Sequence, residues 1–421
     1  MRIDELGQAE ADALIEQLRR GTPPARNVSL YSAGHEKLLT TVRRRHLEPD
    51  PVAGKIRFVH GSWGSGKTHF FRLVTEEAFE AGWIVSTVEL SAQETPFNKF
   101  ELVLHAIVRN IATWEGDRTA TSSLGDVLRA ALEAEVAKSD DDVVDVVARM
   151  TERLFAEPGI DIDVKKIVRQ YWDTFCAQES DDVVLQERRA HLMQWFAGES
   201  HKGTVRKDFG IQKTVSKENA RVVLSSLTGL LQFLGYKGLL ILFDESEMSH
   251  STMSKSNLKQ AHNNLLHLIN EVGETPGLFL VYAAVPEFFS DPKTGVVIYG
   301  ALAARIGDLP DHAPRSLDQV WNLDQLHLEV QAYEEAALRI RAIYERAFPG
   351  EEQELLPEPE LRERIGRAVE GHAQHHATSR WRLVVQETTK LLDLCIEGGD
   401  LPEPEESVAE TRSRLGQIGD D

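Results

Sequence analysis

The feature that most constrains this chain is a glycine-rich segment, residues 61–68, that directly follows a short apolar stretch. It reads GSWGSGKT and fits the pattern G-x-x-x-x-G-K-[ST] at every required position. Glycines let consecutive backbone N–H groups curve around phosphate oxygens, and a helix that begins there adds the positive end of its dipole. The pattern therefore predicts a phosphate-binding loop between a strand and a helix.

The segments around this loop have the matching periodicities. Residues 55–60 read as a buried strand, residues 67–81 as a helix, residues 83–90 as a second strand and residues 97–114 as a helix. Strand, loop, helix and strand in this order are typical of a parallel α/β sheet. Further buried strands are predicted at residues 238–243, 278–285 and 320–323.

Outside these strands the sequence is mostly helical in pattern, and the whole chain divides into five parts. Apolar residues at helical spacing and acidic helix starts predict an all-helical insertion, and prolines break a long helical tail near residues 349 and 357. The last stretch is acidic and is expected to be frayed. The parts are an N-terminal helical segment (1–50), an α/β core that contains the loop (51–116 and 218–328), a helical insertion (117–217), a helical lid (329–398) and an acidic tail (399–421).

A second motif supplies the acids that a triphosphate site needs. Residues 239–245 read LLILFDE, an apolar strand that ends in two carboxylates, and open α/β sheets bind ligands at this end of their strands. Asp244 is expected to hold Mg²⁺ through water, and Glu245 to activate the attacking water as general base. Lys67 is expected to reach the β- and γ-phosphates of ATP, and Thr68 to coordinate Mg²⁺.

The complete set of predicted nucleotide-binding residues is the loop and the histidine after it. These residues are Gly61, Ser62, Trp63, Gly64, Ser65, Gly66, Lys67, Thr68 and His69. The side chains of His60 and His69, which flank the loop, are expected to pack rather than to catalyse.

The charge of the chain argues against broad contact with nucleic acid. The 47 Lys and Arg residues against 67 Asp and Glu residues give a net charge of −20, which repels a phosphate backbone over most of the surface. A DNA contact would need a local basic patch, and a solvated loop is the alternative interpretation of the same residues. The candidate patch consists of Lys202, Arg206, Lys207, Lys213 and Lys217.

The composition favours a cytoplasmic protein with no membrane contact. No stretch approaches the roughly 20 apolar residues that span a bilayer. The first residues are acidic and lack the apolar region of a secretory signal. Cys176 and Cys395 are far apart in the sequence and suggest no metal or redox motif.

Both motifs together, followed by a helical tail, resemble the AAA+ fold of the initiator (Orc/Cdc6-like) branch. The flanking residues resemble the BREX phage-defence ATP-binding proteins more closely, over roughly residues 10–115 and 235–395, and the length resembles the smaller members of that family. The matching segments are IEQLRRG (15–21), GSGKTHF (64–70), VELS (88–91), ETP (94–96), KFE (99–101) and VPEFF (285–289).

This resemblance implies an oligomeric AAA+ ATPase that restricts phage DNA replication beside a methyltransferase and a phosphatase-like partner. It also implies an arginine finger, for which Arg305 is the candidate, and a lid sensor arginine, for which Arg380 or Arg382 is the candidate. Surface salt bridges are the alternative for these arginines. The chain departs from the AAA+ pattern where a polar sensor is expected, because residues 282–285 read YAAV. Because such a sensor orients the water or the γ-phosphate, the departure argues against rapid hydrolysis.

Two functions therefore compete. The first is an ATPase that acts on DNA or on a DNA-bound complex within a defence system. The second is a nucleotide-gated adaptor that binds ATP, hydrolyses it slowly and recruits protein partners through its acidic surface. A small-molecule phosphotransferase shares the phosphate loop but is the weakest alternative, because no acceptor-site motif is recognisable.

Overall fold

The computed structural model describes ten stretches of the chain, which form two compact units. The described residues are 2–62, 65–115, 119–121, 123–177, 182–199, 207–211, 213–244, 253–351, 354–372 and 380–418. The first unit contains Met1–Arg44, His60–Glu77 and Pro310–Asp421, and the second contains Arg45–Val59 and Ala78–Leu309.

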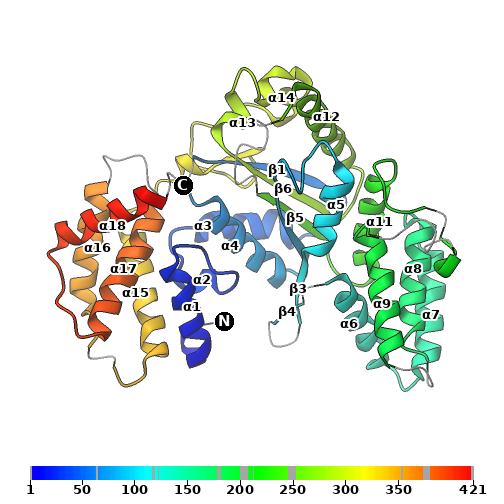
Figure 1. The fold of residues 1–421 in the computed structure, drawn as a ribbon, viewed down its shortest axis with the longest axis horizontal. Coiled ribbons are helices and arrows are strands. Elements are labelled where there is room, and N and C mark those ends of the chain that lie inside the picture. Colours follow the sequence, from blue (N-terminus) through cyan, green and yellow to red (C-terminus); the bar gives the residue numbers. More distant parts are fainter. Residues whose placement is uncertain are drawn as a thin grey trace. The chain divides into compact units, whose positions relative to one another are not determined.

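The second unit is built on a mostly parallel sheet, in which six strands follow the order β4-β3-β2-β5-β6-β1 (Figure 1). Strands β2 and β5 run parallel, as do β5 and β6, while β3 runs antiparallel to both β2 and β4. The predicted mixed α/β class is confirmed. The strands are β1 (Lys55–His60, whose last residue belongs to the first unit), β2 (Ile84–Glu89), β3 (Ile111–Glu115), β4 (Thr119–Thr121), β5 (Leu239–Asp244) and β6 (Leu278–Ala284).

The core of this sheet lies in β5 and β6. Every residue of both strands is buried, which explains why each reads as a continuous apolar run rather than as an alternating one. The helices and short helical turns that accompany the sheet are α5 (Phe100–Arg109), α11 (Ala220–Phe233), α12 (Lys255–Val272), α13 (Pro286–Ser290), η3 (Val296–Ile298) and α14 (Gly300–Ile306).

Four further helices of the second unit pack against one another (Figure 1). They lie within residues 117–217, where the sequence predicts an all-helical insertion, but strand β4 lies in the same range, so the segment is not helical throughout. Helix α7 begins after Asp142, one of the expected acidic starts, and buries Val146, Val147, Met150 and Leu154 along one face. The four helices are α6 (Leu124–Val136), α7 (Val143–Ala156), α8 (Ile162–Asp173) and α9 (Asp182–Phe196).

One predicted helix is wrong in its second half. The helix expected over residues 97–114 ends at Arg109, and Ile111–Glu115 form strand β3 instead. Ile111 and Thr113 are buried and alternate with the half-buried Ala112 and Trp114, so this segment has a period of two. Its pairing with β2 supplies the backbone hydrogen bonds that decide for a strand.

The first unit contains the N-terminal helices, the phosphate loop with the first turns of its helix, and the C-terminal helices. In Figure 1 helices α15 to α18 lie side by side, and α1 packs against α15 and α17. None of the described helices combines the length and the apolar character needed to cross a membrane. The elements of this unit are η1 (Ile3–Glu5), α1 (Gln8–Arg19), α2 (Val28–Tyr31), α3 (Glu36–Val42), α4 (Lys67–Glu80), β7 (Val320–Asn322), η4 (Leu323–Gln325), α15 (Val330–Ala347), α16 (Glu358–His372), α17 (Arg380–Ile396) and α18 (Pro404–Ile418). Residues Arg43–Leu47 form the short helical turn η2.

The acidic tail is not frayed as expected, because most of it forms helix α18. Proline and acidic residues suit the first turn of a helix, where the lost N–H and the negative charge both fit. Ser407 and Thr411 are buried, and their hydroxyls donate hydrogen bonds to the two carboxylate oxygens of Glu387 on α17. Tertiary hydrogen bonds and apolar burial of Val408 therefore hold a segment whose composition alone suggests disorder.

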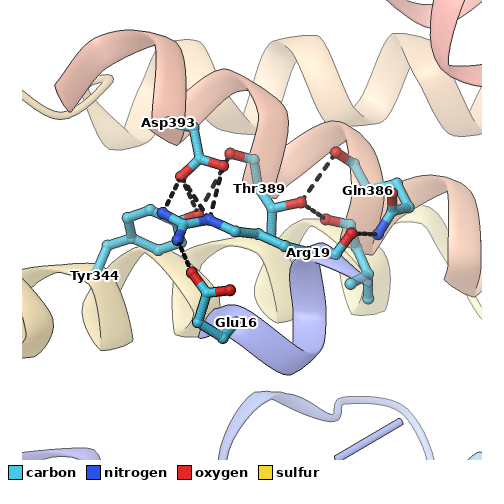
Figure 2. A network of polar contacts seen from close by, with 7 residues as sticks. Glu16, Arg19, Tyr344, Gln386, Thr389 and Asp393 are labelled. Carbon is cyan, nitrogen blue, oxygen red and sulfur yellow. Dashed lines mark hydrogen bonds and ion pairs between the residues drawn. The ribbon is translucent and has the colours of Figure 1, made fainter. Parts of the chain in front are cut away.

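A polar network fastens α1 to the C-terminal helices (Figure 2). The Arg19 guanidinium donates to the Asp393 carboxylate, with Nε 3.0 Å from Oδ2 and Nη2 2.6 Å from Oδ1. The Tyr344 hydroxyl donates to the same carboxylate at 2.7 Å, and Gln386 Nε2 donates to the carbonyl oxygen of Leu18 at 2.8 Å. The hydrogen bonds to Asp393 raise the pKa of Arg19, and burial beside Asp393 raises that of Tyr344. One carboxylate thus satisfies groups from two other helices.

We predict that Asp393→Ala lowers the free energy of unfolding by about 2 kcal/mol, because it leaves two partly buried donors without their charged acceptor. Urea unfolding of the purified variant measures this change. Asp400→Ala is the matched control: it removes an exposed carboxylate from the same region and should cost less than about 0.5 kcal/mol. Equal losses in the two variants would contradict the prediction.

Candidate functional site

The phosphate loop starts where β1 ends and leads directly into α4. Gly61 is buried, and a Cβ atom at this position would lie 2.2 Å from the hydroxyl oxygen of Ser65, so a larger residue would displace the Ser65 side chain. Gly66 has a φ of +93°, which L side chains rarely adopt. Trp63 and Gly64 lie outside the described residues. The backbone therefore favours glycine at position 66, and glycine at position 61 leaves room for the Ser65 side chain.

The loop holds its lysine on its own carbonyl groups. Lys67 Nζ donates to the carbonyl oxygens of Gly61 at 2.8 Å and of Ser62 at 3.1 Å, and the side chain is only 9% exposed. A buried ammonium group is tolerated because these acceptors replace the water that it loses. The amine is thereby kept inside the curve of the loop, at the place where a phosphate group would be bound.

The start of α4 has the geometry of an anion site. The first bond of the helix runs from the Phe70 N–H to the Gly66 carbonyl oxygen at 2.8 Å, so the amides before it point out of the N-terminal end of the helix. Thr68 is exposed at this end, so its hydroxyl can reach a metal ion bound to the phosphates. The amides, the lysine and the hydroxyl group are therefore of the types that bind a nucleoside triphosphate with Mg²⁺.

The side chain of His69 is buried and faces the interior of the first unit, so the ring packs there as expected and does not join the predicted nucleotide-binding side chains. Its ring stacks on Trp381 at 5.1 Å, and its Nε2 lies 2.7 Å from the Ser32 hydroxyl. The ring of His35 lies 5.5 Å from both His69 and Trp381. Helix α4, the N-terminal segment and α17 thus meet in one buried aromatic cluster.

Burial keeps both histidines of this cluster neutral. Desolvation, with a smaller contribution from the neighbouring His35, lowers the pKa of His69 to about 3. Desolvation likewise lowers the pKa of His35 to about 4, against a smaller opposing effect of its hydrogen bond to the Ala33 carbonyl. Protonation of either ring would place a charge in an apolar interior.

In the second unit, Asp244 is the last residue of β5. It is 9% exposed, and its neighbours in register are Glu89 on β2 and Ala283 on β6. The expected carboxylate therefore lies at the carboxyl end of a central parallel strand, where ligands bind in open sheets. Glu245, the expected general base, lies outside the described residues.

The candidate arginines have neighbours within their own units. Arg305 Nε on α14 donates to Asn270 Oδ1 at 3.1 Å, and this arginine is exposed. Arg380 is the first residue of α17, and its charge lies beside the hydroxyl of Tyr333. Arg382 Nε donates to the Gly21 carbonyl oxygen at 3.4 Å. Of the two lid candidates, Arg382 is thus engaged in holding the N-terminal segment.

The predicted basic patch is described only in part. Lys202 and Arg206 lie outside the described residues, while Lys207, Lys213 and Lys217 are exposed. Lys217 Nζ lies 3.9 Å from a carboxylate oxygen of Glu218. Part of the local positive charge is therefore offset by an adjacent acid.

A residue of the site that the sequence patterns do not reveal is Asp324, in the turn after β7. Its carboxylate accepts hydrogen bonds from the backbone N–H and from the hydroxyl of Ser62 in the phosphate loop. The available signal is weak: an Asn and an Asp two residues apart at the end of a predicted strand are also typical of ordinary turns.

Comparison with known proteins identifies one family. The family model for the BREX system ATP-binding protein BrxC/D matches residues 6–410. A comparison with curated proteins finds no match.

We predict that the two buried histidines make stability fall in mild acid. In the unfolded chain both histidines become protonated below a pH of about 6.5. In the folded protein their pKa values are about 4 for His35 and about 3 for His69, so they stay neutral over this range. Each histidine should therefore cost about 2 kcal/mol between pH 7 and pH 5. Urea unfolding at the two pH values should give a loss that is smaller by about that amount in His69→Phe.

The matched control is His327→Phe, which removes an exposed imidazole and should retain the full acid loss of the wild type. If His69→Phe loses as much stability in acid as this control does, burial of the ring is not the cause.

Proposed function

Because the chain belongs to the BREX system ATP-binding protein BrxC/D family, we propose that it is a Mg²⁺-dependent ATPase of the AAA+ type in a bacterial anti-phage defence system. Membership of this family supports ATP binding, and it confirms the resemblance to the BREX ATP-binding proteins that the sequence motifs indicate. The proposal adds hydrolysis, a cytoplasmic location, and action on DNA or on a DNA-bound complex together with other defence proteins, as a homo-oligomer.

The observation that carries the proposal is the loop with its buried lysine. Lys67 is already inside the curve of the loop, bonded to carbonyl oxygens that a phosphate group can replace as partners. We assign it to the β- and γ-phosphates of ATP. The exposed Thr68 hydroxyl and, through water, the Asp244 carboxylate are assigned to Mg²⁺ from the chemistry of their motifs.

The remaining roles are assigned from the sequence motifs. Glu245, which follows Asp244 at the end of β5, is the proposed general base that activates water for attack on the γ-phosphate. Arg305 is the proposed finger toward the nucleotide of a neighbouring subunit, and Arg380 the proposed lid sensor. Both are charges that would stabilise the transferring phosphoryl group.

We predict that Lys67→Ala abolishes ATP binding, and that Glu245→Gln retains binding but lowers turnover by about 100-fold or more, the usual scale of general-base catalysis. Titration with a fluorescent ATP analogue measures binding, and phosphate release measures turnover. Lys37→Ala, which removes an exposed lysine of the first unit, is the control and should behave as the wild type. Equal turnover in all four proteins would reject hydrolysis at this site.

The alternative function, a slowly hydrolysing adaptor, has one specific observation in its favour. Tyr282, Ala283 and Ala284, which end β6 beside the Asp244 strand, are buried and offer no Asn or Thr at the place of a polar sensor. The net charge of −20 also suits protein partners better than DNA.

We expect an adaptor to form an ATP-dependent complex with a protein partner that survives Glu245→Gln and is lost in Lys67→Ala. Co-purification with the other proteins of its defence system, with and without ATP, measures this. Turnover that DNA stimulates many-fold, with a steep salt dependence of DNA binding, would instead favour the ATPase that acts on DNA.

A further inference from the structure

A carboxylate from the turn after β7 binds the strand side of the phosphate loop. Asp324 accepts two hydrogen bonds from the Ser62 N–H, at 2.9 Å to Oδ1 and 3.0 Å to Oδ2. The Ser62 hydroxyl donates a third at 2.7 Å. Hydrogen bonds to an ionised acceptor are about twice as strong as neutral ones, so this contact restrains the backbone of Ser62.

The turn that carries Asp324 is itself fixed by a buried asparagine. Asn322 is 3% exposed, and its Oδ1 accepts a hydrogen bond from the Asp324 N–H at 3.2 Å. The same oxygen lies 3.0 Å from His60 Nδ1, and Asn322 Nδ2 donates to the Pro310 carbonyl oxygen at 2.7 Å. His60 is the last residue before the loop. The carboxylate is therefore held in register with the residues that start the loop.

Two side chains thus bind the backbone of the same two residues, and each side chain uses different backbone atoms. Lys67 binds the carbonyl oxygens of Gly61 and Ser62, while Asp324 binds the N–H and the hydroxyl of Ser62. When the Lys67 ammonium moves to a phosphate, its bonds to these carbonyls weaken, and the contact with Asp324 stays available. A carboxylate that mimicked a phosphate would instead occupy the amides at the start of α4.

We propose that Asp324 is a positioning residue that keeps the Gly61–Ser62 end of the loop in its binding shape while Lys67 transfers to the nucleotide. The proposal rests on the proposed function of the loop in binding Mg²⁺-ATP. The negative charge of Asp324 by itself opposes a triphosphate. The direction in which its removal changes affinity therefore separates positioning from repulsion.

The test compares Asp324→Asn and Asp324→Ala with the wild type by titration of the full chain with a fluorescent ATP analogue and Mg²⁺. The Asn variant keeps one acceptor oxygen and the Ala variant keeps none. We expect Kd to rise about threefold in the first and about tenfold in the second, the scale of one lost hydrogen bond to a charged group. In turnover assays KM should rise by the same factors while kcat at saturating ATP stays within about twofold.

Two controls accompany the titration. Asp311→Asn removes an exposed carboxylate of the same unit and should leave Kd unchanged. Thermal unfolding without nucleotide reports whether the variants fold, and Asp324→Asn, with its nearly unchanged shape, keeps the test valid if the Ala variant does not.

The outcomes are distinct. Wild-type affinity in Asp324→Asn and in Asp324→Ala, with binding lost in Lys67→Ala, would overturn the positioning role and leave the proposed function intact. Tighter binding in either Asp324 variant would also overturn it, because the carboxylate would then only repel the triphosphate. Absence of binding by the wild type would overturn the proposed function, and this inference with it.

Discussion

The ammonium group of Lys67, bonded to two carbonyl oxygens of its own loop, is the interaction around which the candidate site is arranged. A lysine in this position is nearly buried, so it needs acceptors, and the loop supplies them by curving its first carbonyls inward. Two glycines suit this curve: Gly61 leaves room for the Ser65 side chain, and Gly66 adopts dihedral angles that other residues rarely adopt. The sequence pattern G-x-x-x-x-G-K-[ST] thus describes one physical arrangement rather than separate requirements.

The contacts that surround this arrangement come from distant parts of the first unit. Asp324 binds Ser62, and the ring of His69 stacks on Trp381 at the start of α17. The second residue of the loop and the residue after Thr68 are therefore both tied to elements from the C-terminal part of the chain. Because a closely packed interior transmits strain, a shift of α4 would displace α17 through the aromatic cluster.

The N-terminal segment takes part in the same assembly. The carboxylate of Glu76 on α4 accepts hydrogen bonds from the N–H groups of Val28 at 2.7 Å and Ser29 at 3.1 Å. Helix α1 is fastened to α15 and α17 through Asp393, and Gln386 satisfies carbonyl groups at the end of α1. The segment before the loop therefore bridges the helix that would bind phosphate and the C-terminal helices.

The sequence by itself determined the elements that depend on local chemistry. The loop, the strands before and after it, the buried strand that ends in Asp244 and the helical character of most of the remaining chain follow from period, glycine placement and apolar runs. Local pattern failed at residues 111–114 and in the tail. In the first case pairing with β2 outweighed a helical spacing, and in the second burial against Glu387 ordered an acidic segment.

Only the tertiary structure decided which polar groups meet. Asp324 and Ser62 are 262 residues apart in the chain, and Arg19 and Asp393 are 374 apart. The sequence around each residue carries no information about such pairs. An Asp in a turn or an Arg at a helix end has the same neighbouring residues whether its side chain faces water or a partner. Packing of the elements fixes these contacts, and with them the surroundings of the phosphate loop.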